Sequence, residues 1–246
     1  MQIKRLLTAL VSPGYLAALF RYRRAAAATG RMVPEFSHLR PMLSEATAQT
    51  GFDTHYVYHT AWAARILAAK RPEKHVDIGS SLYFVGIASS TTPMIHYDYR
   101  PPAIGLPDVE VGAADLLALQ FPDRSIASLS CMHVVEHVGL GRYGDTLDPE
   151  GDLKACRELA RVLAPGGVLL FVTPVGQPSV HFNAHRIYSY EAIRAMFSGL
   201  ELESFSLITD KRDGACLVWD CDPARVAKQR YGCGCFVFRK PATQVL

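Results

Sequence analysis

Residues 127–138 read ASLSCMHVVEHV, and residues 158–174 read ELARVLAPGGVLLFVTP. The first segment begins within a predicted strand, Ile126–Met132, and continues into a polar loop. The second begins on a predicted helix, Gly151–Leu163, and continues after a Pro-Gly-Gly break as an unbroken apolar strand, Val168–Thr173. A strand that is apolar on both faces is typical of a parallel sheet covered by helices on both sides. The two segments therefore predict an α/β fold.

The alternation of strands and helices extends in both directions from this stretch. Further strands are predicted at His75–Ile78, Met94–Asp98, Leu202–Ile208 and Cys235–Arg239. Further helices are predicted at Pro41–Thr50, Asp53–Lys70 and Ser189–Phe197. In an open sheet of this kind, ligands bind beyond the carboxyl ends of the strands, near the point where strand order reverses. Functional residues are therefore expected in the loops that follow the strands.

Acidic residues and a glycine occupy these strand ends. Asp77 and Gly79 close the first predicted strand, and Asp98 closes the second, 21 residues after Asp77. A carboxylate at that second position can accept hydrogen bonds from ribose hydroxyls. Asp115 and Asp123 follow in the loop region before the next strand. The pattern favours a nucleoside-containing ligand. The absence of a G-x-G-x-x-G motif after the first strand argues against a dinucleotide oxidoreductase.

In this order and spacing, the chain resembles a class I S-adenosylmethionine (SAM)-dependent methyltransferase over about residues 74–240. The segments EHVGLGRYGD, DPEGDL and FNAHRIYS further resemble a poorly characterised branch of that superfamily. The resemblance implies a seven-stranded Rossmann-like sheet of order 3-2-1-4-5-7-6, with the last strand antiparallel and helices on both faces. It implies methyl transfer to a small molecule, a glycan or a glycan precursor.

The resemblance also assigns a cofactor site. Asp77 and Gly79 would lie against the methionine end of SAM, Asp98 would hold the ribose, and Asp115 with Leu116 would meet the adenine. The floor near the methyl group would be formed by Cys131, Met132 and His133, and Ser81 would belong to the first loop. That loop reads Gly79-Ser80-Ser81-Leu82-Tyr83, where the superfamily usually has G-x-G-x-G. The departure leaves two interpretations open. Either SAM is held in an altered loop, or the chain is a non-catalytic methyltransferase-like module that binds a partner or a membrane surface through its basic N-terminus.

Histidines after the strands are the candidate bases for methyl transfer. His185 is the favoured substrate-facing base, and His133 and His137 are the other candidates, since an oxygen or nitrogen nucleophile needs a base of suitable pKa. The structural alternative is that Glu136 and His137 fix their loop and that His185 bonds to backbone. Other residues are candidate pocket or anion-binding groups, or ordinary core and surface residues: His55, Tyr56, His59, Arg142, Tyr143, Asp145, His181 and Arg186.

Composition limits the remaining function classes. The chain has 246 residues, 49% of them hydrophobic, and a net charge of +3, which excludes wholesale disorder. Residues 1–40 carry a net charge of +6, so the remaining chain is slightly acidic. No basic stripe with interleaved aromatic residues lies in that acidic part, and a nucleic-acid partner is therefore not expected. We expect a basic N-terminal helical extension, residues 1–50, and a methyltransferase-like domain, residues 51–246.

The extension begins with Lys4 and Arg5, followed by the apolar run Leu6–Phe20, which Pro13-Gly14 interrupts. The run is too short to span a membrane, and its break and following arginines argue against a secretory signal. Two interpretations remain: a helix pair packed on the domain, or a basic segment, residues 1–31, that contacts a partner protein or a membrane surface. The expected location is cytoplasmic, with or without membrane association.

Six cysteines do not form a disulfide scaffold in a chain of this length. Four of them follow the spacing C-x4-C-x11-C-x-C near the C-terminus, ending with Cys233 and Cys235. These two would share one face of a strand, which makes a metal site an alternative, although structural zinc sites usually pair cysteines in tight turns. Buried reduced thiols are the favoured interpretation, and no metal is expected.

Overall fold

The computed structural model describes residues 12–242. The chain divides into two compact units, Met1–Phe52 and Asp53–Leu246. Predictions about Lys4, Arg5 and the start of the apolar run therefore lie outside the described residues. Within the described part of the chain, no helix combines the length and apolar character needed to cross a membrane.

In the first unit, the described residues 12–52 form the α-helix α2 (Pro13–Ala28) and a short 3-10 helix, η1 (Phe36–His38). The Pro-Gly pair that interrupts the apolar run marks the start of α2: Ser12 caps the helix by accepting a hydrogen bond from the Tyr15 amide, and proline occupies the first turn. The prediction of a helix over residues 41–50 was wrong, because these residues form no helix and are almost all exposed. An isolated short segment without an apolar face to bury does not sustain a helix in water.

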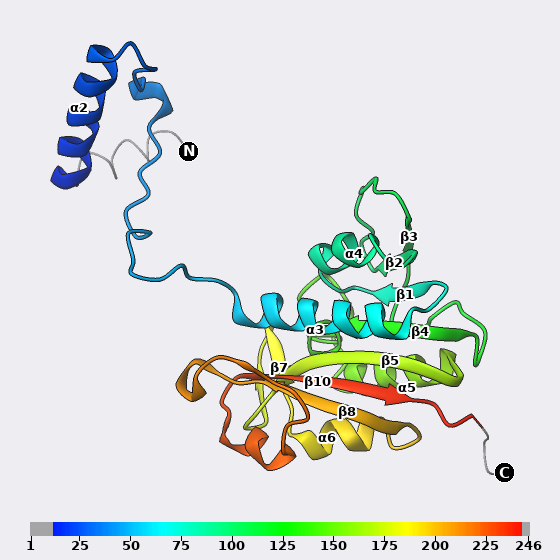
Figure 1. Cartoon of the computed structure of the whole chain (residues 1–246). Coiled ribbons are helices and arrows are strands. Elements are labelled where there is room, and N and C mark those ends of the chain that lie inside the picture. Colours follow the sequence, from blue (N-terminus) through cyan, green and yellow to red (C-terminus); the bar gives the residue numbers. More distant parts are fainter. Residues whose placement is uncertain (1–11, 243–246) are drawn as a thin grey trace. The chain divides into compact units, whose positions relative to one another are not determined.

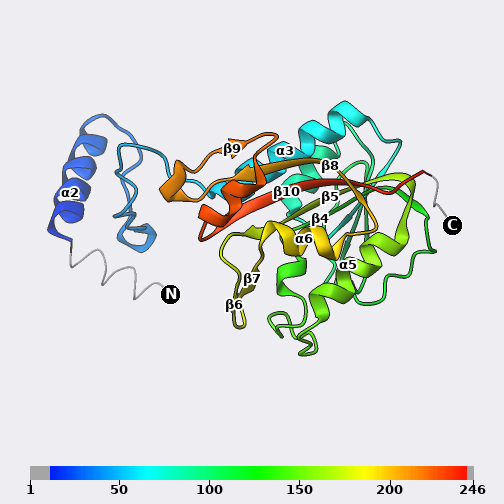
Figure 2. The same cartoon turned by 90° about the horizontal axis from the view of Figure 1, so that it is seen from below.

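The second unit is built on an eight-stranded sheet of order β3-β2-β1-β4-β5-β10-β8-β9 (Figures 1 and 2). The strands are β1 (His75–Ile78), β2 (Met94–Asp98), β3 (Val109–Ala113), β4 (Ile126–Met132), β5 (Leu163–Val175), β8 (Glu201–Ile208), β9 (Leu217–Val218) and β10 (Gly232–Arg239). A separate hairpin consists of β6 (Ser179–His181) and β7 (His185–Ile187).

The predicted topology is confirmed. Strands β3, β2, β1, β4 and β5 pair in parallel, whereas β10 runs antiparallel to both β5 and β8 between which it lies. This is the order 3-2-1-4-5-7-6 with an antiparallel last strand. The difference from seven strands is β9, a two-residue strand added to the edge beside β8.

Helices cover both faces of the sheet, as Figures 1 and 2 show: α3 and α4 lie on one face, and α5 and α6 on the other. Their bounds are α3 (Thr54–Lys70), α4 (Leu82–Ala88), α5 (Gly151–Val162) and α6 (Tyr190–Met196), with 3-10 helices η2 (Val135–His137), η3 (Lys211–Asp213) and η4 (Pro223–Lys228). Asp53 caps α3 by accepting a hydrogen bond from the Tyr56 amide.

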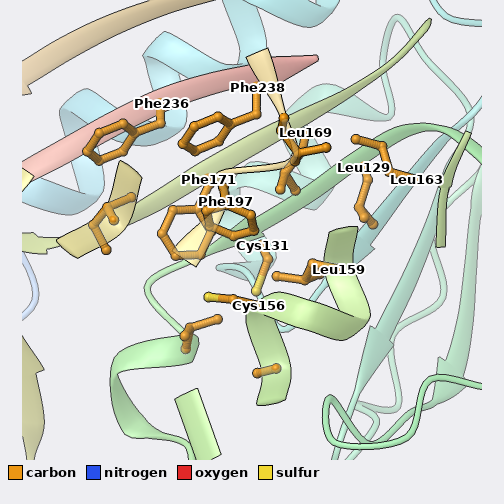
Figure 3. Close-up of a cluster of buried hydrophobic side chains, with 14 of the residues drawn as sticks. Leu129, Cys131, Cys156, Leu159, Leu163, Leu169, Phe171, Phe197, Phe236 and Phe238 are labelled. Atoms are coloured by element: carbon orange, nitrogen blue, oxygen red, sulfur yellow. The ribbon is translucent and has the colours of Figure 1, made fainter. Parts of the chain in front are cut away.

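The alternation of side chains along β5 and β10 divides the core between these two faces. Phe171, Phe236 and Phe238 pack with α5 and α6, together with Phe197 (Figure 3). Residues one position away, such as Val172, pack on the α3–α4 side. Both clusters are buried, because successive side chains of a central strand point to opposite faces.

Sequence patterns placed the start of β5 too late and did not identify α4, β3, β9 or the β6–β7 hairpin. Strand β5 begins at Leu163, before the Pro-Gly-Gly sequence, and its pairing with β4 shifts register near Ile126. Strand β3 reads Val-Glu-Val-Gly-Ala and none of its residues is fully buried, so no continuous apolar run marks it. Strands β6 and β7 have three residues each, which is too few to show a pattern.

Candidate functional site

A cavity of about 230 Å³ opens at the carboxyl ends of the parallel strands. Its walls come from the ends of β1 and β2, the loop after β3, the segment after β4 and the following glycine-rich loop. The lining residues are Ile78, Gly79, Asp98, Tyr99, Arg100, Ala114, Asp115, Leu116, Leu117, His133, Val134, His137, Val138, Tyr143, Asp145 and Thr146. We call this the strand-end cavity. It lies where parallel α/β sheets bind their ligands.

Gly79 forms the turn from β1 into the cavity wall. Its amide donates to the Tyr97 carbonyl at 2.7 Å, and its φ of +69° is a conformation that favours glycine. A Cβ at this position would also meet the Val134 side chain at 3.0 Å. The backbone therefore passes close to the cavity only because residue 79 has no side chain.

Ser80 and Ser81, which follow Gly79, form hydrogen bonds that stabilise the fold. Ser80 is buried and accepts a hydrogen bond from the Met132 amide at 3.1 Å. Ser81 caps α4 by accepting from the Tyr83 amide, and it does not line the strand-end cavity. The Tyr83 side chain is 81% exposed and also lies outside the cavity lining. The departure from the glycine-rich pattern thus leaves the cavity open.

Asp98 and Asp115 both line the cavity. One oxygen of Asp98 accepts from the Arg100 amide at 2.7 Å, and one oxygen of Asp115 accepts from the Leu117 amide at 2.8 Å. Each bond holds a carboxylate in its own loop and leaves the second oxygen available to a ligand. Leu116, predicted beside Asp115, also lines the cavity.

Asp77 does not line the cavity. Its carboxylate is fully buried beneath the sheet end, where it accepts hydrogen bonds from the Ser80 amide at 3.2 Å, the His96 ring at 2.8 Å and the Ser130 hydroxyl. This differs from the predicted contact with a cofactor. The physical reason is that the carboxylate is already satisfied by three internal donors.

Cys131 and Met132 are also placed away from the cavity. Cys131 is buried among the side chains that face α5, near Cys156 and Phe171 (Figure 3). Met132 is buried in the cluster on the opposite face. Both belong to β4 before it ends, so their side chains enter the two core layers, and neither forms the predicted cavity floor.

His133 follows β4 directly and borders the cavity with φ +58°. Its Nδ1 lies 2.8 Å from Oε1 of Glu136, and its Nε2 lies 3.3 Å from Sγ of Cys233. Glu136 is 1% exposed, and burial raises its pKa to about 7, whereas burial lowers the pKa of His133 to about 4. The imidazole is therefore neutral near pH 7.

His137 lies one helical turn away and also lines the cavity. Its Nδ1 is 2.6 Å from the Ala184 carbonyl, to which Arg142 donates at 3.0 Å. Burial lowers the pKa of His137. These contacts tie the loop after β4 to the β6–β7 hairpin, consistent with the loop-fixing alternative, while the ring still borders the cavity.

His185, the favoured base, does not line the strand-end cavity. It lies in a second, shallower cavity of about 510 Å³, with Gln177, Pro178, Ser179, His181, Ile187, Arg230 and Tyr231. We call this the hairpin cavity. The His185 ring stacks on His181 at a centroid distance of 4.9 Å and lies 5.0 Å from the ring of Tyr231. Sequence reasoning missed Tyr231, which no local pattern distinguishes from a surface tyrosine.

The first turn of α3 packs against residues of both cavities. His55 stacks between His133 and Tyr231, with ring centroids 5.4 Å and 4.9 Å away. Tyr56 stacks on His133 at 5.5 Å. These helix residues, predicted either to close the pocket or to belong to the core, pack directly against the histidine that borders the strand-end cavity.

Comparisons with known proteins agree on the fold. The sequence profile of the family described as "Caenorhabditis protein of unknown function, DUF268" matches residues 120–214, which is less than half of the chain. No curated protein sequence matches significantly.

Solved structures match far more of the chain. The N-methyltransferase NodS from Bradyrhizobium japonicum, determined with S-adenosyl-L-homocysteine, is 15% identical, with a TM-score of 0.53 over 80% of this chain and 94% of that one. The YcgJ protein from Bacillus subtilis is 18% identical, with a TM-score of 0.51 over 75% and 99%. A SAM-dependent methyltransferase from Methanosarcina mazei is 15% identical, with a TM-score of 0.50 over 72% and 98%. The chain therefore has the fold of the class I SAM-dependent methyltransferases.

Proposed function

We propose that this protein is a SAM-dependent methyltransferase that acts on a small molecule, a glycan or a glycan precursor. The observation that carries the proposal is the strand-end cavity, in which Gly79, Asp98 and Asp115 converge from the ends of three neighbouring strands. The fold comparison supports the same proposal, because one of the similar structures was determined with the demethylated product of SAM.

The residues of the cavity fit the chemistry of SAM. The available oxygen of Asp98 can accept from ribose hydroxyls, and that of Asp115 from an exocyclic amino group. Between the two carboxylates, Ala114 and Leu116 offer an apolar surface suited to a flat base. The carboxylates also favour a ligand that carries a positive charge.

When bound, SAM would supply a methyl group already activated by its sulfonium. The protein then has three tasks: to align the acceptor, to exclude water and to remove a proton where the acceptor carries one. His133 and His137 border the cavity and are neutral near pH 7, because burial lowers the pKa of both rings. They are our candidate bases at this cavity.

We assign the acceptor to the side of the hairpin cavity. His185 is the third candidate base, and burial lowers its pKa, which keeps the imidazole able to accept a proton. Arg230, Tyr231 and His181 around it offer a cation, an aromatic face and a second imidazole. Groups of this kind suit a polar acceptor that carries hydroxyl or anionic substituents.

Calorimetric titration of the full chain with SAM tests the proposal. We expect 1:1 binding that Asp98→Asn weakens by about 10- to 100-fold, because the charged acceptor for the ribose hydroxyls is lost. Glu73→Gln is the matched control, because Glu73 is exposed and lies outside the cavity lining. Failure of SAM to bind at about millimolar concentration would favour the alternative, a non-catalytic methyltransferase-like module.

We further propose that the basic extension, residues 1–50, acts in partner or membrane-surface contact, through residues 1–31, rather than in catalysis. Arg21, Arg24 and Arg31 are exposed in its described part. Deleting residues 1–30 should therefore change binding to anionic vesicles or a partner while SAM affinity stays unchanged. Collapse of the fold on this deletion would show instead that the segment is structural.

A further inference from the structure

Two imidazoles and a thiol converge beside the strand-end cavity. His55 from α3, His133 after β4 and Cys233 from β10 each present a ligand atom, and these atoms lie within 4.8 Å of one another. The shortest separation is the 3.3 Å between Nε2 of His133 and Sγ of Cys233. Three segments far apart in the sequence thus bring two nitrogen donors and one sulfur donor to one point.

In both His55 and His133, the ring nitrogen that faces away from the cluster already has a hydrogen-bond acceptor. His133 presents Nδ1 to the Glu136 carboxylate at 2.8 Å, which leaves the Nε2 lone pair directed at Cys233. The His55 ring has a hydrogen-bond partner in the backbone of Tyr231, which leaves one ring nitrogen for the cluster. Metal-binding histidines almost always have this arrangement, in which a carboxylate or backbone carbonyl fixes the ring and its tautomer.

His59, one turn along α3 from His55, gives a second and independent signal. Its Nδ1 bonds to the His55 carbonyl at 2.7 Å, so its Nε2 carries the lone pair. This Nε2 is buried and has no hydrogen-bond partner in the described part of the chain, and the ring lies 5.0 Å from that of His133. An unsatisfied buried acceptor costs about 1–3 kcal/mol, which a ligand at this point would offset.

We propose that His55, His133 and Cys233 bind one Zn²⁺ ion and leave its fourth position open. In the zinc-bound form His133 is a ligand, and His137 and His185 are then the candidate bases. Zinc bonds of about 2.0–2.1 Å to nitrogen and 2.3 Å to sulfur place tetrahedral donors roughly 3.3–3.6 Å apart. The His133–Cys233 pair already meets this spacing. The other donor pairs lie within 4.8 Å, so binding requires them to approach by roughly 1 Å. Cys233 binds as a thiolate and releases its proton to solvent. The open position takes a water or a substrate heteroatom, with the Nε2 of His59 nearby as an acceptor.

A Cys-His-Glu nucleophilic triad is the competing interpretation of Cys233, His133 and Glu136. A nucleophile must reach its substrate, but Cys233 is fully buried and lines neither the strand-end cavity nor the hairpin cavity. A metal ligand has no such requirement. The contribution of His55, which a triad does not need, also favours the metal site.

The test uses the untagged full chain, stripped with a chelator and titrated with Co²⁺ as a spectroscopic probe and then with Zn²⁺. We expect one equivalent of Co²⁺, tetrahedral visible bands and a sulfur-to-cobalt charge-transfer band, all lost on addition of Zn²⁺. Cys233→Ala should abolish the charge-transfer band, and His55→Ala should weaken binding by about 100-fold or more, beyond the cost of losing an outer partner. The matched controls, Cys221→Ala and His181→Ala, should bind as the unmodified chain does.

Circular dichroism confirms that each variant is folded, and His55→Ala keeps the test decisive where Cys233→Ala does not fold. Binding of less than one equivalent, the absence of the charge-transfer band, or equal affinity in His55→Ala and His181→Ala would overturn the proposal. The titration contains no SAM, so its outcome is separate from that of the proposed methyltransferase activity.

Discussion

Replacing Asp77 by alanine tests whether this residue serves the fold. Its buried carboxylate accepts hydrogen bonds from the Ser80 amide, the His96 ring and the Ser130 hydroxyl. In Asp77→Ala, the Ser130 hydroxyl keeps a partner, because Nε2 of His75 lies 2.9 Å away. The Ser80 amide and the His96 ring lose their acceptor in a site that water does not reach.

The expected loss of stability comes from the Ser80 amide and the His96 ring, which are left without a hydrogen-bond acceptor. Each unsatisfied buried donor costs about 1–3 kcal/mol, so the free energy of unfolding should fall by about 2–6 kcal/mol. A domain of this kind is stable by about 5–15 kcal/mol, and the loss is therefore a large part of the total.

Chemical denaturation at pH 7, followed by circular dichroism, measures this loss. Asp123→Ala is the matched control, because its side chain is 71% exposed and its ion pair with Arg161 is worth about 1 kcal/mol or less. If Asp77→Ala lost no more stability than Asp123→Ala, the internal hydrogen-bond network would not have the structural role assigned to it.

Two further predictions concern the same strand end. Gly79→Ala should lower the free energy of unfolding by about 1–2 kcal/mol because of the positive φ, and by a further packing cost because the new Cβ meets Val134. Gly144→Ala is the control, because this glycine also has a positive φ but has open space around it. Thermal unfolding of Gly144→Ala should therefore show the backbone cost alone. Burial lowers the pKa of His96, but the hydrogen bond and charge of Asp77 outweigh this and raise the pKa above its ordinary 6.5. The stability contributed by His96 should therefore be complete below about pH 6.5 and decline as pH rises through the raised pKa, so that wild type and His96→Gln converge at high pH in denaturant titrations. Equal losses in the two glycine variants, or a stability difference for His96→Gln that grows with pH, would contradict these predictions.

The sheet could be predicted from sequence because its central strand β5 is apolar on both faces. Val168–Thr173 is an unbroken apolar run, and its neighbours alternate with amphipathic helices such as α5. The segment over residues 41–50 was wrongly predicted as helix because composition does not reveal whether a helix has a surface to pack on. The edge strand β9 depends on pairing with β8, a long-range interaction that two residues cannot encode locally.

The cavity residues were predictable where a strand end fixes their position. Gly79, Asp98, Asp115 and Leu116 follow their strands directly, and all four line the strand-end cavity. The side chain of Cys131 could not be oriented from sequence, because one residue of register along β4 separates the core from the cavity.

The approach of Cys233 to His133 and His55 could not be predicted from the sequence either. The sequence spacing pairs Cys233 with Cys235, its neighbour on the same strand face. The structure instead brings Cys233 to His133, one hundred residues earlier, and to His55 on α3. Such a cluster depends on the packing of α3 over β10, which no local spacing records.

A crystal structure of the full chain soaked with SAM tests most directly whether the strand-end cavity binds SAM. We expect ligand density in the cavity, with the ribose at Asp98, the base beside Asp115 and Leu116, and the sulfonium toward His133. A cavity that remains empty at about millimolar SAM, or SAM bound at a site that does not include Asp98, would contradict the proposed cofactor site.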